Sequence, residues 1–337
     1  GSYFANLNRS KRSIVLDLKQ HEHRQALLRL LETADVFVHN MRPGAARRLG
    51  LDYASIAARN PRIVHASASG FRKGSTKQEA PAFDDLIQGV SGLAALNAGP
   101  DGAPRYVPTV LVDKLTGHML ATMIAMALVH RERTGQGQEV HVPMLETTLG
   151  FLLVEHLWGA TLGEPERGIG YPRMLTPHRR PYPTQDGYIS VIASSDAQYA
   201  RLFEAIGRPE LTGDPRFSNI AARARNIDAL LAVLSDGLRS RSTEAWLAVL
   251  TAADIPCGRA NSLRDLLDDP YLRETGFFGQ ADHPMEGKVT VPAIAAEFSA
   301  TPPSVQRLWP QLGEHTAEVL REVGYSDADI RRIATGR

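Results

Sequence analysis

The chain has 337 residues, with 38 basic and 37 acidic side chains and a formal net charge of +1 at pH 7. This balance argues against a nucleic-acid-binding protein, which usually carries a basic excess or a basic stripe. The length suits two domains or one elaborate domain.

Membrane and secretion signals are not expected in this sequence. No apolar stretch is both long and charge-free enough to span a bilayer, and the longest candidate, 119–129, is too short. No signal peptide opens the chain. The single cysteine, Cys257, excludes an internal disulfide and favours a reducing, cytoplasmic compartment. Cys257 is either a reactive thiol or, as we favour, a small buried apolar residue.

The first half of the chain alternates between strand and helix patterns. β-Branched and apolar runs predict strands at 13–18, 35–39, 63–68 and 139–142. Apolar spacing and turn residues predict helices at 20–33, 45–49, 84–97 and 144–160. This alternation indicates an α/β fold with a parallel sheet covered by helices.

Asp113 is a lone carboxylate at the entry to a long apolar helix. The segment 115–129 is apolar almost all round, so we expect it to be buried. Asp113 would cap free N–H groups and meet the positive end of the helix dipole, which keeps a carboxylate ionised. Local sequence alone favours an ordinary N-cap for Asp113; a nucleophile in a dry pocket is the alternative.

The composition changes at 162–187, which is rich in Gly, Pro, Arg and Tyr and is typical of a linker or active-site loop. Beyond it the patterns predict a strand and four helices, at 188–193, 219–238, 243–253, 314–323 and 326–334. We therefore expect a large α/β domain at 1–165, a linker at 166–185, a small α+β domain at 186–285 and a return to the large domain at 286–337.

Five segments resemble the class III coenzyme A transferases, the formyl-CoA transferase and carnitine CoA-transferase family. In order they are NRSKRSIVLDLK (8–19), HNMRPGAARRLGLDY (39–53), LVDKLTGHMLA (111–121), RERTGQGQEVHVPMLE (131–146) and LGEHTAEVLREVGYS (312–326). The resemblance implies a Rossmann-like parallel-sheet domain, a smaller second domain and an interlocked homodimer. It also implies that a few dozen residues with a first strand and a CoA-contacting loop are missing ahead of Tyr3.

Asp113 falls on the nucleophilic aspartate of that family. The resemblance implies an aspartyl anhydride and then an aspartyl-CoA thioester, with coenzyme A as a substrate and no metal. The pair His21 and His23 also makes a poor metal site, because residues two apart project to different sides of a helix.

The family match also names coenzyme A contacts. They are Leu16, Asp17, Leu18 and Lys19, then Asn40, Met41 and Arg42, then Arg48 as a phosphate-binding arginine, and Phe83 beside them. Ligands of open α/β sheets sit at the carboxyl ends of strands, and an arginine fork suits phosphate oxygens. Without the resemblance, Lys19 and Arg48 would be read as solvated surface charges.

Two departures from the family pattern bear on specificity. Phe83 stands where the related α-methylacyl-CoA racemases carry a catalytic histidine, and phenylalanine cannot move a proton. The consecutive glycines of formyl-CoA transferase are absent, and the loop 168–180 stands in their place. Its arginines, at 173, 179 and 180, either meet a carboxylate of the acceptor or are surface charges. An acyl-CoA racemase and a non-catalytic CoA-binding subunit remain the alternatives to a CoA-transferase.

Overall fold

The computed structural model describes residues 1–335, and these residues form two compact units. Unit 1 is Gly1–Leu152 together with the residues from Gly276 onward, and unit 2 is Leu153–Thr275. The boundaries thus fall at 152 and 275, where the sequence led us to expect 165, 185 and 285.

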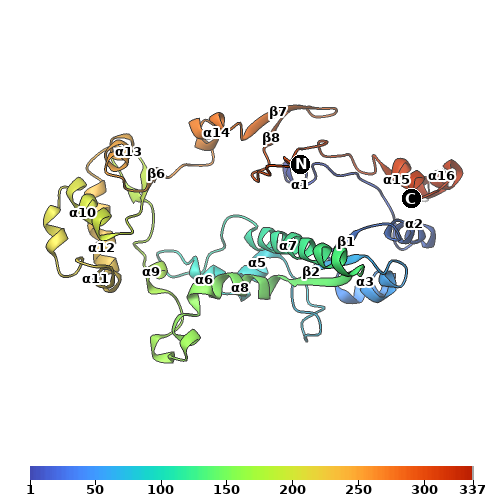
Figure 1. The fold of residues 1–337 in the computed structure, drawn as a ribbon, viewed down its shortest axis with the longest axis horizontal. Helices are drawn as coiled ribbons and strands as arrows, with labels where there is room; N and C mark the ends of the chain where they lie inside the picture. The colour runs from blue at the N-terminus through green and yellow to red at the C-terminus, as the bar shows by residue number, and fades with distance from the viewer. Residues whose placement is uncertain (336–337) are drawn as a thin grey trace. The chain divides into compact units, whose positions relative to one another are not determined.

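A parallel sheet forms the centre of unit 1 (Figure 1). It contains β1 (Val36–His39), β2 (Val64–Ser69) and β3 (Gln138–Pro143), in that order. Val36 pairs with Val64, and Val64 pairs with Gln138. The expected mixed α/β class with a parallel sheet is confirmed, since the β-branched runs of the sequence form these three strands.

The helices of unit 1 before Leu152 mostly follow the predicted ones. They are α1 (Ser2–Leu7), α2 (His21–Leu31), α3 (Pro43–Leu49), α4 (Tyr53–Ala57), α5 (Asp84–Val90), α6 (Leu93–Leu96), α7 (Leu111–Thr134) and α8 (Met144–His156), which runs on into unit 2. The prediction of one helix over 84–97 was wrong. Gly92 has a φ of +87°, a left-handed conformation that separates α5 from α6.

The predicted strand at 13–18 is absent, although the segment avoids helix. Its backbone groups bond to residues of the chain's last quarter instead of to a neighbouring strand. His315 N donates to Ser13 O at 2.9 Å, and Val15 N donates to Thr316 Oγ1 at 3.1 Å. The β-branched run therefore satisfies its backbone without a ladder, which local sequence cannot reveal.

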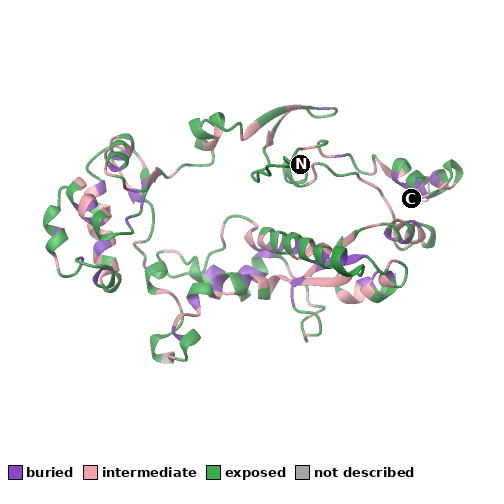
Figure 2. Ribbon diagram, in the orientation of Figure 1, coloured by how far each residue is buried: buried purple, intermediate pink, exposed green. Residues whose placement is uncertain are grey.

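Helix α7 is less buried than its composition predicts. One face packs on the sheet through Leu120, which contacts Ala66 and Val142 in a buried cluster. The remainder is largely exposed, including Met126 and Val129 (Figure 2). The expectation of burial on all sides was wrong for the chain taken by itself.

The same helix corrects the expectation that no stretch is long enough for a bilayer. Within the described residues, Leu111–Thr134 alone has the length and apolar composition to cross a membrane, with a mean hydropathy of 1.3 over its best window. Length and composition are weak grounds for a span, because core helices have the same character. One apolar face of α7 packs against β2 and β3 of the sheet, which accounts for part of its apolar composition.

Unit 2 has its own small antiparallel sheet and apolar core. The strands are β4 (Tyr182–Pro183), β5 (Tyr188–Val191) and β6 (Cys257–Arg259). The helices are α9 (Pro172–Leu175), α10 (Asp196–Ala205), α11 (Ile220–Arg225), α12 (Ile227–Leu238), α13 (Thr243–Ala252) and α14 (Pro270–Glu274), with 3₁₀ turns at Trp158–Leu162, Pro165–Arg167, Pro209–Gly213 and Asp265–Leu267. Cys257 is half-buried against the core.

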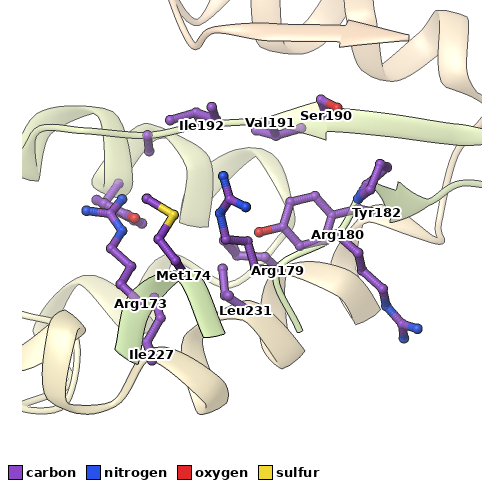
Figure 3. A pocket seen from close by; sticks show the side chains of 14 residues that line it. Arg173, Met174, Arg179, Arg180, Tyr182, Ser190, Val191, Ile192, Ile227 and Leu231 are labelled. Atoms are coloured by element: carbon purple, nitrogen blue, oxygen red, sulfur yellow. The ribbon is translucent and has the colours of Figure 1, made fainter. Parts of the chain in front are cut away.

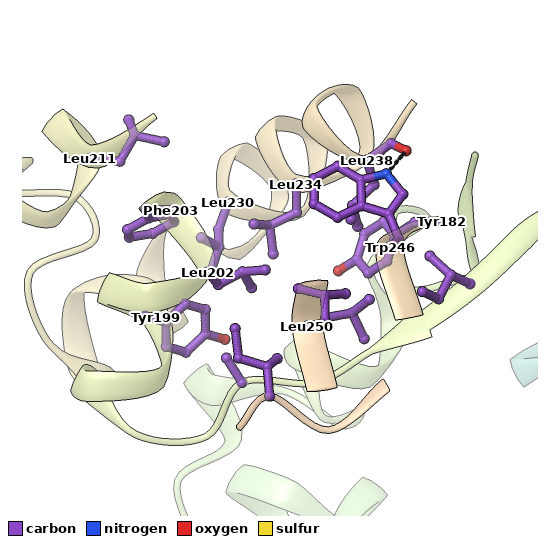
Figure 4. Packing of buried hydrophobic residues seen from close by; sticks show 14 of the residues in the cluster. Tyr182, Tyr199, Leu202, Phe203, Leu211, Leu230, Leu234, Leu238, Trp246 and Leu250 are labelled. Carbon is purple, nitrogen blue, oxygen red and sulfur yellow. Dashed lines mark hydrogen bonds between the residues drawn. The ribbon is translucent and has the colours of Figure 1, made fainter. Parts of the chain in front are cut away.

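The core of unit 2 is centred on Trp246, which is fully buried with Leu238 and Leu250 (Figure 4). Its ring nitrogen donates to Leu238 O at 2.7 Å, so the indole is buried without an unsatisfied donor. The prediction of one helix over 219–238 was wrong, because Asn226, with φ −113° and ψ 32°, breaks it into α11 and α12.

The last part of the chain rejoins unit 1. Strands β7 (Phe278–His283) and β8 (Gly287–Pro292) form a hairpin, and α15 (Thr316–Glu322) and α16 (Asp327–Thr335) follow it. Leu320 and Ile330 pack against Ala26 of α2 in a buried cluster. Helix α2 near the start of unit 1 and helices α15 and α16 at its end therefore share one apolar cluster.

Candidate functional site

A cavity of about 480 Å³ lies where the carboxyl ends of β1 and β2 meet the first turns of α7. Loops after two parallel strands and the start of a helix enclose it, the usual position of ligands in open α/β sheets. The lining residues come from five short stretches: Asn40, Arg42, Ala68, Ser69, Gly70, Gln78, Ala80, Pro81, Ala82, Phe83, Asp113, Thr116, Gly117 and Met144.

Asp113 lies in the first turn of α7 and lines this cavity. It is not the N-cap: Val110 holds that position, and no side chain caps the helix. Desolvation by the surrounding protein raises the pKa of the Asp113 carboxyl, and the nearby charge of Asp84 raises it further. The expectation of an N-cap aspartate stabilised as the anion was therefore wrong in its geometry and in the direction of the pKa shift.

A buried carboxylate fixes the backbone of Asp113. Asp84, at the start of α5, is 5% exposed and accepts the Asp113 N–H at 3.0 Å through Oδ1. Its other oxygen, Oδ2, accepts from Gln88 Nε2 at 2.5 Å. Gln88 in turn accepts the N–H of Val107 at 2.8 Å. The chain of bonds ties α5, the loop before α7 and the first turn of α7 together.

Thr116 is the residue of this cavity that the sequence did not single out. It is 4% exposed, and its buried Oγ1 has no hydrogen-bond partner among the residues that the structure describes. A helical threonine commonly bonds back to the carbonyl four residues earlier, as Thr122 does with His118 O at 2.9 Å. Thr116 keeps its hydroxyl available beside Asp113, and only the Asp-x-x-Thr spacing hints at this in the sequence.

Gly70 allows the wall of the cavity to close in. A Cβ atom added at Gly70 would lie 2.1 Å from the Cβ of Ala82, far inside van der Waals contact. The absence of a side chain thus lets the end of β2 approach the segment before α5. Both residues line the cavity, so this contact sets its width.

Three of the predicted coenzyme A contacts share the cavity with Asp113. They are Asn40 and Arg42, which follow β1, and Phe83, the N-cap of α5. Phe83 is 77% exposed. The Arg42 side chain makes no hydrogen bond or ion pair within residues 1–335, which leaves a free cation at the rim.

The other predicted contacts lie elsewhere in unit 1. Leu16 and Leu18 pack into two apolar clusters, and Asp17 accepts the Lys19 N–H at 3.0 Å in a turn before α2. This bond is the main cause of the lowered pKa of Asp17. Met41 lines a second cavity, and Arg48 is an exposed residue on α3. As contacts of coenzyme A, these residues remain predictions.

The second cavity of unit 1, about 210 Å³, lies on a sheet face that carries histidines. His39, His65 and His141 come from β1, β2 and β3. The His39 ring accepts the Met41 N–H through Nδ1, so its neutral form carries a proton on Nε2, and that buried atom has no described partner. Burial lowers the pKa of His39 to about 4, and the charge of His65 contributes. His39 is therefore uncharged near neutral pH. Among the described residues, no three His, Cys, Asp or Glu side chains are grouped as a metal site.

The sequence matches one family model over residues 1–316, described as CoA-transferase family III. A succinate–glutarate CoA-transferase of Agrobacterium fabrum is 30% identical, over 99% of this chain and 82% of the relative. A formyl-CoA:oxalate CoA-transferase of Escherichia coli is 31% identical, over 97% of this chain and 84% of the relative.

Solved structures agree with the sequence comparison. A CAIB/BAIF family protein from Brucella suis superposes with a TM-score of 0.78 at 29% identity, covering 96% of this chain and 84% of that one. A hypothetical protein from Mycobacterium tuberculosis superposes with a TM-score of 0.79 at 29% identity, covering 94% and 85%.

The Asp84 contacts predict the effect of removing this carboxylate. Asp84→Ala leaves the Asp113 N–H and the Gln88 amide without their acceptor, and should lower the free energy of unfolding by about 1.5–3 kcal/mol, as expected for hydrogen bonds to a charged group. Asp85→Ala is the matched control, since Asp85 is its exposed neighbour on α5 and should change stability by less than ~0.5 kcal/mol. Equal stability of the two variants in urea unfolding would show that the bonds contribute nothing.

Proposed function

Because this chain belongs to CoA-transferase family III, we propose that it moves coenzyme A from an acyl-CoA thioester to a free carboxylic acid, with Asp113 as the nucleophile. The observation that carries the assignment is the position of Asp113. Its carboxyl lines a 480 Å³ cavity at the carboxyl edge of the sheet, and its pKa is raised. A more basic carboxylate is a better nucleophile once it is ionised.

The proposed reaction exchanges one thioester for another in balanced steps. The Asp113 carboxylate attacks the acyl-CoA carbonyl; a C–O bond forms, the C–S bond breaks, and CoA thiolate leaves a mixed anhydride. The thiolate attacks the aspartyl carbonyl, which releases the donor acid and gives an aspartyl-CoA thioester. The acceptor carboxylate then displaces thiolate to give a second anhydride. Attack of thiolate on the acceptor carbonyl releases the new thioester and regenerates Asp113, with no net proton transfer.

Thr116 suits the role of a hydrogen-bond donor to these adducts. Each attack places negative charge on a carbonyl oxygen, and a donor aimed at that oxygen stabilises the transition state. The Thr116 hydroxyl is buried, unpartnered and one turn along α7 from Asp113. An apolar side chain of the same shape would have served better if packing were its only role.

Coenzyme A binding is proposed along the same edge of the sheet. Arg42 and Asn40 lie at the cavity rim, where a guanidinium can meet phosphate oxygens in a fork. Arg48 on α3, with Met41 and the turn 16–19, extends this surface in the way the family resemblance implies. The acid acceptor is proposed to be a small aliphatic mono- or dicarboxylate, the chemistry named in the two curated relatives.

A homodimer in the cytoplasm is part of the proposal. Large apolar side chains remain exposed on α7, at Met119, Met126 and Val129, and on α8, at Phe151. Large exposed apolar side chains mark interaction surfaces when they gather, and we propose that a second copy covers them. The absence of disulfides among the described residues, with Cys257 free, fits a reducing compartment.

Phe83 argues against the racemase alternative. Racemisation needs a proton carrier on each side of the α-carbon, and Phe83 occupies the cavity rim where the related racemases have a histidine. A non-catalytic CoA-binding subunit would not need a carboxyl of raised pKa in its cavity. Thioester exchange followed in deuterated water separates the three, since only a racemase exchanges the α-hydrogen and a binding subunit does neither.

Asp113→Asn should abolish exchange, with a loss of at least ~10³-fold in kcat, because the amide cannot form the anhydride. Hydroxylamine should trap a hydroxamate on Asp113 of the native protein only when acyl-CoA is present. The native rate should rise with pH through the raised pKa of Asp113, since only the ionised form attacks.

The stability of the same variant provides a check with a defined sign. A raised pKa means that the fold disfavours ionised Asp113, so Asp113→Asn should gain a little stability at neutral pH, no more than ~0.5 kcal/mol for an exposed group. The gain should shrink as the pH falls through the raised pKa of Asp113 in the fold, and vanish below the ordinary pKa that the carboxyl has in the unfolded chain. Native-like turnover by the variant would remove Asp113 from the mechanism.

Thr116→Val should reduce kcat by about 100-fold while leaving the melting temperature unchanged or higher, since it removes an unsatisfied buried hydroxyl without changing the shape. Thr122→Val, on the same helix with a satisfied hydroxyl, is the control and should keep full activity. If Thr116→Val lowers the melting temperature but leaves kcat unchanged, the Thr116 hydroxyl has a structural role and no role in catalysis.

Arg42→Ala and Arg48→Ala should each weaken coenzyme A binding by roughly 1.5–3 kcal/mol, as for a lost charge-assisted hydrogen bond. Arg133→Ala, an exposed arginine of α7, should change it by less than ~0.5 kcal/mol. Calorimetric titration with CoA measures all three. If only Arg42→Ala weakens coenzyme A binding, the CoA contacts are confined to the rim of the cavity. If neither variant weakens it, the nucleotide binds at another place.

A further inference from the structure

Unit 2 contains a cavity of its own, about 360 Å³ in volume, that the proposed reaction does not use (Figure 3). Helices α9, α10 and α12 and strands β4 and β5 surround it. Its lining residues all lie in unit 2: Arg173, Met174, Arg179, Arg180, Pro181, Tyr182, Ser190, Val191, Ile192, Ala193, Tyr199, Ile227, Leu231 and Leu234.

The floor of this cavity is apolar and rigid. Val191, Ala193 and Leu234 are 3–7% exposed and belong to the core cluster of unit 2, with Leu231 packed against them. Side chains held this firmly present a fixed hydrocarbon surface, on which an aliphatic chain can be removed from water.

The polar side of the cavity carries cations without counter-ions. Arg173, Arg179 and Arg180 make no side-chain hydrogen bond or ion pair among residues 1–335, and no acidic side chain lines the cavity. Seven other arginines of unit 2 each pair with a carboxylate, namely Arg167, Arg201, Arg208, Arg216, Arg223, Arg259 and Arg273. The three arginines of the cavity lack such a partner in the described part of the chain.

Two buried phenols face the same space. Tyr182 and Tyr199 are 6% and 9% exposed, and neither hydroxyl has a hydrogen-bond partner in the described part of the chain. Neither hydroxyl oxygen is among the fully buried unpartnered atoms of the described residues, so both remain accessible where the two residues line the cavity. Burial raises the pKa of Tyr182 to about 12, so this phenol keeps its proton and stays a donor. In Figure 3 the Tyr182 hydroxyl points to the side where the Arg179 side chain stands, while Arg180 extends away from both.

We propose that this cavity binds an aliphatic carboxylate, with the carboxyl group held by Arg179, Arg173 and the Tyr182 hydroxyl and the hydrocarbon chain on the Val191–Leu234 floor. The guanidinium groups supply only donors and the protonated phenol supplies a further one, which matches the acceptor-only chemistry of a carboxylate. An inorganic anion would leave the apolar floor unused. The inference stands on unit 2 alone and does not require Asp113 to be a nucleophile.

Calorimetric titration of the full chain with acetate, butanoate and hexanoate tests the cationic side and the apolar floor of the cavity together. Affinity should rise by about fourfold for each added methylene as the chain covers the floor, and hexanamide, which lacks the charge, should bind at least tenfold more weakly than hexanoate. Equal binding of hexanoate and hexanamide, or of hexanoate and inorganic phosphate, would overturn the proposal.

Two variants locate the binding. Arg179→Gln and Tyr182→Phe should each weaken hexanoate binding, by at least tenfold and by about fivefold respectively, with an unchanged melting temperature. Arg225→Gln removes the same charge from an exposed arginine of unit 2 outside the cavity and should leave the affinity unchanged. If hexanoate binds equally to the native protein and to both cavity variants, its site lies elsewhere and the inference fails.

Discussion

The hydrogen bond from the Asp113 backbone to the buried Asp84 carboxylate is the contact on which the candidate site depends. It holds the first turn of α7 against α5, and the fully buried Ile87 and Val112 pack beside it. Desolvation is the main cause of the raised pKa of Asp113, and the charge of the Asp84 carboxylate raises it further. One buried group therefore fixes the position of the proposed nucleophile and contributes to its basicity, so the geometry and the reactivity of the site are coupled.

Much of the fold could be predicted because local composition determines it. The runs that form β1, β2 and β3 are β-branched, and the helix around Asp113 is apolar. The wrong predictions concern segments whose structure depends on contacts with residues far away in the sequence. Backbone partners near His315 take the place of a ladder for the segment 13–18, and the exposed face of α7 depends on what covers it. Such contacts leave no periodic trace in the segment itself.

The site was predictable to a similar degree. Asp113, Asn40 and Arg42 were singled out because a family resemblance marks them, and these three residues line one cavity, whereas Met41 lines another. Thr116 and Asp84 were missed because their significance lies in a missing partner and in a bond across 29 residues of sequence. Whether a hydroxyl has a hydrogen-bond partner depends on the side chains folded around it, and residue spacing in the sequence does not predict those neighbours.

Unit 1 is discontinuous, since the whole of unit 2 is inserted between Leu152 and Gly276. Ser13 receives its backbone partner from His315, and Arg12 pairs with Glu318 and Glu322. On the ribosome these partners emerge only after every residue of unit 2 has been made. Unit 2 can fold as soon as its own chain is free, whereas the segment around Ser13 must stay unpaired through most of synthesis. Unit 2 can therefore fold earlier during synthesis than unit 1. The unpaired segments of unit 1 stay open to contacts with other chains for longer.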